Sequence, residues 1–476
     1  MLFNSIQFLV FFPLVTLFYF LLPHRFRWVL LLAASCYFYM FFVPYYILIL
    51  IFTIIIDYFA GILIEKQSYP KQKKIFLIVS IIANIGVLAI FKYYDFFIDN
   101  INSIFHLLNS PDHFEKLSII LPIGLSFHTF QAMSYTIEVY HGKIKAERHF
   151  GIYALYVMFY PQLVAGPIER PQNILPQLHR KNIFDAEKLI SGLRLMLWGI
   201  FKKVVIADTM AQIVNPYYDD VNGSEGWQLL LASYCFAIQI YCDFSGYSDI
   251  ALGAARTMGY SLMQNFKTPY FSKSISEFWS RWHISLSSWF RDYVYIPLGG
   301  NQTSKNKWLR NLIIVFLISG LWHGANWTYI VWGGLHAFFL IFSIMTLKAR
   351  NKIRASIFRN HSVLNFWDIL ITFNLVTFAW IFFRANSVSE AFIIIEKISM
   401  SLVNIKYIFS NIFTILSFSQ WLVFACLVFM FSFERKIDLV NAKFKGGVNN
   451  SFFICLLLLI ILLGKSTQEQ FIYFQF

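Results

Sequence analysis

Long runs without any Asp, Glu, Lys or Arg recur along the whole chain, and this feature restricts its fold more than any other. A run of about 20 apolar residues is long enough for an α-helix to cross the hydrocarbon core of a bilayer. Only 13% of the 476 residues are charged, whereas about 25% is usual for a soluble domain. The pattern predicts an all-α polytopic membrane protein and argues against a soluble, disordered or disulfide-rich secreted chain. The uncharged runs cover residues 1–24, 28–56, 75–91, 117–137, 149–168, 226–242, 311–347, 369–383, 407–433 and 446–464.

The loops between these runs differ in charge, which predicts the side of the membrane that each loop faces. Residues 24–27, 65–74 and 141–148 are basic, whereas residues 93–116 contain four acids and one lysine. Cytoplasmic loops of membrane proteins carry an excess of Lys and Arg. We therefore expect the basic loops in the cytoplasm, the N-terminus outside, and roughly 10 to 12 spans.

The chain shows no repeat or linker that would separate a second domain. We expect one integral membrane domain over residues 1–476, with a motif-bearing core over roughly residues 120–345. Pro44 should divide residues 28–64 into a helical hairpin, because proline lacks an N–H and clashes with the preceding turn. The net charge of +14 sets topology and does not predict nucleic-acid binding. The cysteines have no metal-ligand spacing, so no metal site is expected.

The first chemical motif is Ser-Gly-Leu-Trp-His-Gly-Ala-Asn-Trp at residues 319–327. It lies inside the uncharged run 311–347, which is basic at both ends. Both ends should therefore face the cytoplasm, and the run must enter the membrane and return. The turn could lie at Asn326 or at the pair Gly333-Gly334.

His323 is the residue of this motif that suggests chemistry. It follows Arg310 by 13 residues, which is roughly 20 Å along a helix with a rise of 1.5 Å per residue. An imidazole at that depth is costly, so it indicates a functional site. In the alternative interpretation, Gly320 and Gly324 form a small-residue packing face, and His323 bonds to a neighbouring helix.

A second histidine lies in an aromatic and basic segment, residues 277–292. One interpretation is an interfacial amphipathic helix with tryptophans at the headgroup level. The other is a surface for an anionic, partly aromatic ligand, in which Arg281 and Arg291 meet phosphates and Trp282 meets a purine ring. The histidine itself, His283, lies directly after this tryptophan.

The third motif places two carboxylates in an apolar span. Gln239 and Asp243 share a helical face, as do Ser245 and Asp249, because residues four apart lie one above the other on a helix. Buried acids in membranes face a cavity or pair with another group. A structural polar network and a catalytic carboxylate are both compatible with this pattern. The sequence contains no Walker A, H-E-x-x-H or G-x-S-x-G motif, which argues against an ATP-driven pump, a zinc protease and a serine hydrolase.

Six segments in chain order resemble the membrane-bound O-acyltransferase family. The resemblance is to its bacterial branch, whose members O-acetylate exported or cell-wall polysaccharides such as alginate and peptidoglycan. It implies a ring of roughly 10 to 12 tilted transmembrane helices around a thinned centre, with re-entrant and interfacial helices. The segments that carry it are residues 1–5, 164–170, 243–249, 278–283, 320–324 and 471–476.

The resemblance also implies roles for individual residues. His323 matches the nearly invariant histidine of the family, its presumed catalytic base, and His283 matches a second polar position that holds His, Asn or Asp in different branches. No bound cofactor is implied, and acetyl-CoA is the expected acyl donor. The residues expected to bind donor or acceptor are Trp282, Arg281, Arg291, Trp322, Asn326, Asp243, Ser245, Asp249 and Gln239.

The expected function is transfer of an acetyl group from cytoplasmic acetyl-CoA across the bacterial inner membrane for polysaccharide O-acetylation. The resemblance implies an extracytoplasmic partner of the SGNH-hydrolase type, along with membrane lipid. Two alternatives remain open at this point. One is acyl transfer of another kind within the family, to a D-alanyl, lipid or protein acceptor. The other is a polysaccharide flippase or transporter without covalent catalysis.

Overall fold

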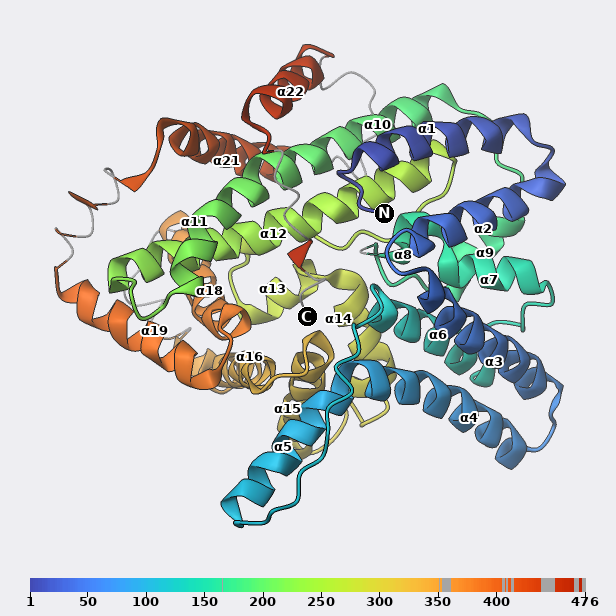
Figure 1. Ribbon diagram of the computed structural model, residues 1–476, viewed down its shortest axis with the longest axis horizontal. Helices are drawn as coiled ribbons and strands as arrows, with labels where there is room; N and C mark the ends of the chain where they lie inside the picture. The colour runs from blue at the N-terminus through green and yellow to red at the C-terminus, as the bar shows by residue number, and fades with distance from the viewer. Residues whose placement is uncertain are drawn as a thin grey trace. The chain divides into compact units, whose positions relative to one another are not determined.

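The computed structural model describes the chain as helices joined by loops (Figure 1). The residues that it describes are 1–164, 166–350, 352, 361–404, 407, 410–411, 415–437, 450–465 and 471–472. No strand occurs among these residues. The chain is therefore the all-α polytopic membrane protein that its hydropathy predicts. Parts of the basic loops 348–359 and 434–445, of the run 446–464 and of the closing segment 471–476 lie outside the described residues.

Two compact units make up the fold. Unit 1 contains Met1–Met196 and Tyr247–Met263, and unit 2 contains Leu197–Gly246 and Gln264–Phe476. That the whole chain acts as one integral domain stays a prediction, as does the ring of helices around a thinned centre. The helices that pass from one unit into the other are α10 (Ala186–Ile200) and α12 (Gly226–Thr257).

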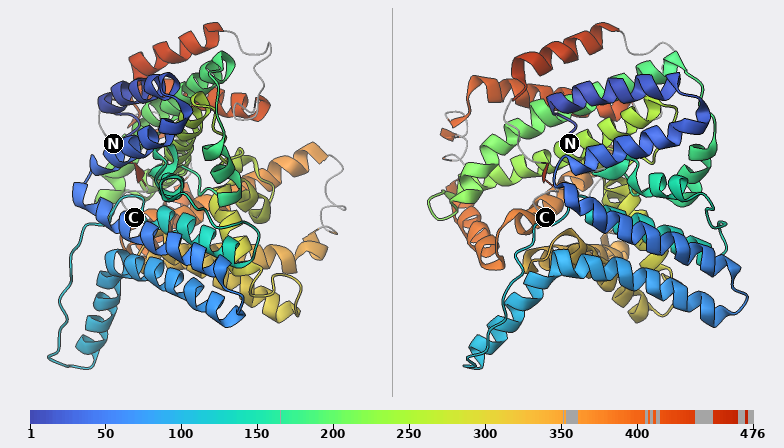
Figure 2. Two further views of the ribbon diagram at one scale, coloured as in Figure 1. Left: turned by 90° about the vertical axis from the view of Figure 1, so that its right-hand side faces the viewer. Right: turned by 45° about the vertical axis from the view of Figure 1, so that its right-hand side comes forward.

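Unit 1 consists mainly of helical hairpins. Its other helices are α1 (Ile6–Leu21), α2 (His24–Met40), α3 (Ile47–Lys66), α4 (Pro70–Leu88), α5 (Tyr94–Leu107), α6 (Leu125–Tyr140), α7 (Phe150–Met158), α8 (Tyr160–Leu163) and α9 (Pro171–His179). A 3₁₀ turn at Pro44–Tyr46 separates α2 from α3, which confirms the hairpin expected at Pro44. α3 and α4 lie side by side (Figure 2). A π-helical turn at Ala89–Tyr93 joins α4 to α5.

A buried carboxylate joins three helices of unit 1. Asp57 of α3 is fully buried, and its two oxygens accept hydrogen bonds from Ser80 Oγ at 2.6 Å and from Asn84 Nδ2 at 2.8 Å, both on α4. Ser80 Oγ also lies 2.9 Å from Thr136 Oγ1 on α6. Because a buried acid without hydrogen bonds is strongly unfavourable, this network fixes the three helices against one another.

Unit 2 holds the motifs that contain both candidate histidines. Four short turns accompany its helices among the described residues: π-helical at Phe201–Ala207 and Arg291–Tyr295, and 3₁₀ at Pro269–Phe271 and Leu402–Asn404. The helices are α11 (Asp208–Asp219), α13 (Ile275–Arg281), α14 (Ile284–Phe290), α15 (Lys305–His323), α16 (Trp327–Met345), α18 (His361–Arg384), α19 (Val388–Ser401), α21 (Phe418–Lys436) and α22 (Asn450–Leu463).

Six helical segments of the described chain are long and apolar enough to cross a membrane, and α1 and α22 are shorter apolar helices. This number is smaller than the roughly 10 to 12 spans expected, because several uncharged runs do not form one long helix. The run 149–168 is divided between α7 and α8, and the run 117–137 becomes helical only at Leu125. The six segments are Pro44–Lys66, Pro70–Leu107, Gly226–Thr257, Trp327–Met345, His361–Arg384 and Phe418–Lys436.

Candidate active site

The turn between α15 and α16 places His323 at a helix end. α15 ends at His323, Gly324 is extended, and Asn326 begins α16 as its N-cap. The Asn326 side-chain oxygen accepts a hydrogen bond from the backbone N–H of Thr328 at 3.0 Å. Asparagine is among the preferred N-cap residues because it satisfies a backbone N–H that lacks a helical partner. Of the two turn positions expected, the structure therefore has the one at Asn326, and the pair Gly333-Gly334 lies inside α16.

Glycines bring the backbones of α15 and α16 into close contact. A Cβ atom at Gly320 would overlap the carbonyl oxygen of Tyr329, and one at Gly333 would overlap that of Phe316. At Gly334 the nearest atom to such a Cβ would be Leu317 Cδ2 at 3.8 Å, an ordinary contact. The packing face expected at Gly320 is thus present. It brings the last turn of α15, which ends in His323, against α16.

Aromatic rings enclose the His323 imidazole, which is 3% exposed. The ring centroids of Trp322, Trp332 and Phe383 lie 5.1, 5.0 and 5.5 Å from its own, all edge-on. Edge-on aromatic pairs at such distances are favourable and define the ring orientation. Trp332 and Phe383 come from α16 and α18, so three helices determine where the imidazole lies.

His283 lies at a break between two short helices. Its backbone φ is +43°, a left-handed conformation that non-glycine residues rarely adopt. α13 ends at Arg281 and α14 begins at Ile284, whose N–H donates to the carbonyl oxygen of Asn265 at 2.9 Å. The single amphipathic helix that the aromatic pattern allowed is therefore not formed. Backbone strain of this kind is concentrated at functional sites.

The structure brings the two histidines to one tryptophan. The Trp322 ring centroid lies 6.2 Å from that of His283 and 5.1 Å from that of His323. His283 is fully buried and packs edge-on against Phe244 of α12, with a centroid distance of 4.7 Å. Burial lowers the pKa of His283 to about 3, so its imidazole is neutral near pH 7. The two imidazoles, 40 residues apart in the sequence, share one aromatic cluster.

The neighbours of His283 in the sequence have partners of their own. Arg281 pairs with Glu277 at 2.5 Å and Arg291 with Asp292 at 2.8 Å. Trp282 is completely buried, 5.2 Å from the ring centroid of Trp380. Their expected roles toward a donor stay predictions.

Asp243 takes part in a buried ion network. Its Oδ1 lies 2.8 Å from Lys203 Nζ, which also lies 2.9 Å from Asp208 Oδ1. Its Oδ2 accepts a hydrogen bond from the backbone N–H of Ile472 at 2.8 Å. This geometry corresponds to the structural alternative, and a role in substrate binding stays a prediction. Asp249 belongs to the part of α12 in unit 1.

Two buried lysines of unit 2, Lys202 and Lys203, were not predicted from the sequence. Besides Lys203, Lys202 Nζ lies 3.1 Å from Glu434 Oε1, and the other oxygen of Glu434 accepts a hydrogen bond from Tyr241 at 2.6 Å. The available signal was two adjacent lysines inside the otherwise apolar segment 195–207. Buried lysines need acids as partners, so that signal would have predicted the pairs without identifying the acids.

Several polar atoms of unit 2 are buried and make no hydrogen bond to a described residue. They include Trp332 Nε1, Thr328 Oγ1 and His336 Nε2. Ser245 Oγ and Gln239 Oε1 on α12 are similar. Buried polar atoms are normally satisfied, so these are candidates for contact with a polar substrate. Among the residues that the structure describes, no group of three His, Cys, Asp or Glu side chains could hold a metal ion.

Comparison with known proteins connects this site to a family. The family described as "MBOAT, membrane-bound O-acyltransferase family" matches residues 147–388, which contain both histidines. A peptidoglycan O-acetyltransferase of Helicobacter pylori is 38% identical over 387 residues, covering 76% of this chain and 71% of the relative. The protein named probable alginate O-acetylase AlgI of Pseudomonas aeruginosa is 38% identical over 394 residues, covering 82% and 73%. A teichoic acid D-alanyltransferase of Bacillus subtilis is 29% identical over 252 residues, covering 50% and 62%.

Proposed function

Because the chain belongs to the membrane-bound O-acyltransferase family and is an acyltransferase, we propose that it transfers acetyl groups for O-acetylation of an exported or cell-wall polysaccharide. The names of its relatives support the acetyl group and the polysaccharide acceptor. The observation that carries the proposal is the contact of both His283 and His323 with the Trp322 ring.

His323 is the general base of the proposed reaction. Its imidazole nitrogen removes the proton from an acceptor hydroxyl while the hydroxyl oxygen attacks the thioester carbonyl of acetyl-CoA. A tetrahedral intermediate forms, the carbon–sulfur bond breaks, and the CoA thiolate leaves and takes up the proton from the imidazolium. The new bond is an acetyl ester on the acceptor. Neutral imidazole suits this transfer because its ordinary pKa lies near neutral pH.

His283 has a different role in this proposal. An imidazole whose pKa is about 3 is too weak a base to hold a proton near pH 7. It can still hydrogen-bond to the acceptor hydroxyl or to the oxyanion of the intermediate. The lowered pKa of His283 therefore argues against His283 as the base, and we assign that role to His323 and the positioning role to His283.

The location and partners are also part of the proposal. Acetyl-CoA reaches the site from the cytoplasm, where its phosphates bind Arg281 and Arg291 in place of their partners Glu277 and Asp292. The chain lies in the bacterial inner membrane with its N-terminus outside. An extracytoplasmic partner of the SGNH-hydrolase type receives the acetyl group and places it on the sugar. The basic loops 24–27, 65–74 and 141–148 support this orientation.

D-alanyl transfer is the second candidate function. It is supported by the similarity to the teichoic acid D-alanyltransferase of Bacillus subtilis. That similarity covers only half of this chain, at lower identity than the O-acetylation relatives. A flippase without catalysis is disfavoured because the family is one of acyltransferases.

The test is acetyl-CoA turnover by the purified protein and its partner in proteoliposomes. We expect His323→Ala to lower turnover by about 10²- to 10⁴-fold, the usual contribution of a general base. His283→Ala should lower it while His283→Asn retains part of it. The matched control is His361→Ala, since His361 is an exposed histidine of the same unit. Normal turnover by a folded His323→Ala protein would reject the base assignment, and turnover with a D-alanyl donor alone would favour the second candidate.

A further inference from the structure

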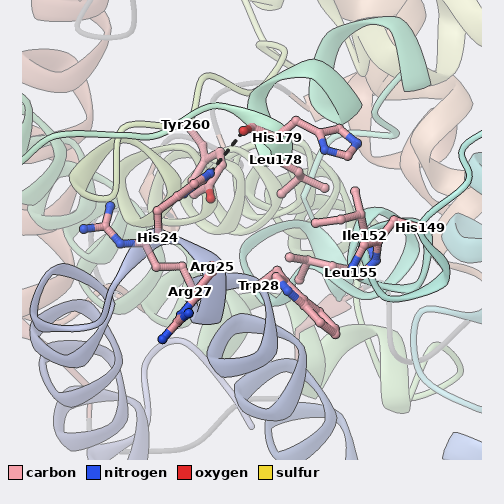
Figure 3. Close-up of a pocket in the computed structure, with 10 residues that line it drawn as sticks. All are labelled: His24, Arg25, Arg27, Trp28, His149, Ile152, Leu155, Leu178, His179 and Tyr260. Atoms are coloured by element: carbon pink, nitrogen blue, oxygen red, sulfur yellow. Dashed lines mark hydrogen bonds between the residues drawn. The ribbon is translucent and has the colours of Figure 1, made fainter.

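Unit 1 contains a cavity of about 270 Å³ that opens to the surface. The start of α2, the start of α7 and the end of α9 surround it (Figure 3). On one side His24 Nε2 donates a hydrogen bond to the backbone carbonyl oxygen of His179 at 3.2 Å, and on another Trp28 packs edge-on against His149 at 4.7 Å. Basic side chains and aliphatic side chains share the lining, which is the composition expected for an amphipathic anion.

The first turn of α2 has an unfavourable charge. It contains His24, Arg25 and Arg27 and no acid, and its N-cap, Pro23, makes no side-chain cap. The N-terminus of a helix carries a partial positive charge, so cations there are destabilising and anions stabilising. An anion bound in the adjoining cavity would reverse this effect.

Arg27 is a buried cation with neutral partners. It is 9% exposed, and its guanidinium donates to the carbonyl oxygens of Leu22 at 3.1 Å and Asn182 at 2.5 Å. It also lies over the ring of Tyr19, 4.8 Å from the centroid. Among the described residues, none of its contacts is a carboxylate. Buried charges are normally paired, so this guanidinium calls for an anion from outside the chain.

Glu147, which contacts two residues of the cavity lining, does not supply that charge. Glu147 Oε2 accepts a hydrogen bond from His179 Nε2 at 2.7 Å, and Glu147 Oε1 accepts one from the backbone N–H of His149 at 2.8 Å. Both oxygens of Glu147 are thus used in these two hydrogen bonds. Glu147 therefore does not compensate the positive charge of Arg25 and Arg27, and an anionic ligand could.

Part of the cavity lining is apolar. Ile152, Leu155 and Leu178 contribute to it. A ligand with an acyl chain would cover this surface, whereas inorganic phosphate would not. The basic loop 24–27 is also one that the charge pattern assigns to the cytoplasmic face, where anionic lipids are found.

We propose that this cavity binds the phosphate of an anionic phospholipid, with Arg25 and the Arg27 guanidinium providing the charge. The phosphates of a soluble ligand such as CoA share this chemistry, and the experiment below separates the two sources. The proposal is independent of the acetyl-transfer function, because it is measured as binding.

The experiment measures binding of dioctanoyl phosphatidylglycerol to the purified full-length protein in a non-ionic detergent by thermophoresis. Dioctanoyl phosphatidylcholine, CoA and inorganic phosphate are the comparison ligands. We expect phosphatidylglycerol to bind about tenfold more tightly than phosphatidylcholine, and Arg25→Gln to remove this preference. Arg25→Glu should abolish the binding of phosphatidylglycerol. The matched controls are Lys71→Gln and Lys71→Glu, which change the same charge in the exposed first turn of α4 and should leave the Kd within twofold.

Each outcome decides the proposal. Equal losses in the Arg25 and Lys71 variants would overturn it, because they would show a general attraction between surface charges. Unchanged binding in a folded Arg25→Glu protein would also overturn it. Arg25-dependent binding of CoA without binding of phosphatidylglycerol would overturn the lipid assignment and identify a soluble phosphate ligand as the occupant.

Discussion

Lys203 Nζ lies 2.8 Å from Asp243 Oδ1, and both side chains are only 2% exposed. The residue after Asp243 is Phe244, whose ring packs edge-on against His283. The ion pair therefore fixes α12 at the point where it contacts one of the two candidate site histidines. Asp208 also pairs with Lys203, so the lysine has two acids around it.

Asp243→Ala should destabilise the protein. Removing one partner of a buried ion pair leaves charge uncompensated, and it also removes the acceptor for the Ile472 N–H. Because Asp208 remains, we expect a loss of about 2 to 4 kcal/mol, below the upper end for a fully isolated charge. The measurement is the thermal unfolding midpoint in detergent. Asp219→Ala is the control, since the Asp219 carboxylate is 69% exposed in its pair with Arg384 and a solvent-exposed partner contributes only about 0 to 1 kcal/mol. Equal effects of the two variants would refute a special role for the buried pair.

Gly320→Ala and Gly333→Ala should weaken the α15–α16 hairpin. In each case the added Cβ would overlap a backbone carbonyl oxygen of the facing helix, which cannot move aside as a side chain can. Overpacking of this kind costs about 1 to 3 kcal/mol. Because His323 follows Gly320 by three residues, turnover should fall as well. Gly334→Ala adds the same atom within the same helix but meets only Leu317, so its stability and turnover should equal those of the wild type.

Asn326 is expected to act through its helix cap. Its oxygen accepts from the Thr328 N–H, and its Nδ2 donates to the carbonyl oxygen of Asn386 at 3.1 Å. Asn326→Ala should therefore cost about 1 kcal/mol of stability, and Asn326→Ser should restore most of it because serine also caps helices. Thermal unfolding and turnover of both variants provide the test. A serine variant that is stable but inactive would instead place Asn326 among the substrate-binding residues.

The neutral state of His283 predicts a pH dependence of stability. Burial lowers its pKa to about 3 in the folded protein, whereas the unfolded chain binds a proton below its ordinary pKa of about 6.5. The unfolded state therefore gains protons as the pH falls from 6.5 toward 3, and folding stability decreases by up to about 1.4 kcal/mol per pH unit. His283→Asn should lessen the fall of the unfolding midpoint between pH 7 and pH 4.5, and His361→Asn should not. A wild-type slope in the His283 variant would show that other groups dominate.

The sequence alone determined the class of fold and singled out candidate site residues. Long uncharged runs leave few structures other than membrane helices, because every backbone polar group in a bilayer must be hydrogen-bonded within the segment. Pro44 could be placed in a turn because proline lacks an N–H and clashes with the preceding helical turn. His283 and His323 could be singled out because an imidazole within a membrane protein is costly to bury, and the sequence alone shows which segments carry one.

Only the tertiary structure decided which residues meet. Nothing in the spacing of Lys203, Asp208 and Asp243 indicates that they form one ion network, and the break at His283 contradicts the helical pattern around it. The physical reason is that periodicity reports which side of its own helix a residue occupies, whereas pairing depends on contacts between helices distant in the sequence. The turn at Asn326 shows the same limit, because glycine pairs and a cap are both possible turn formers until packing selects one.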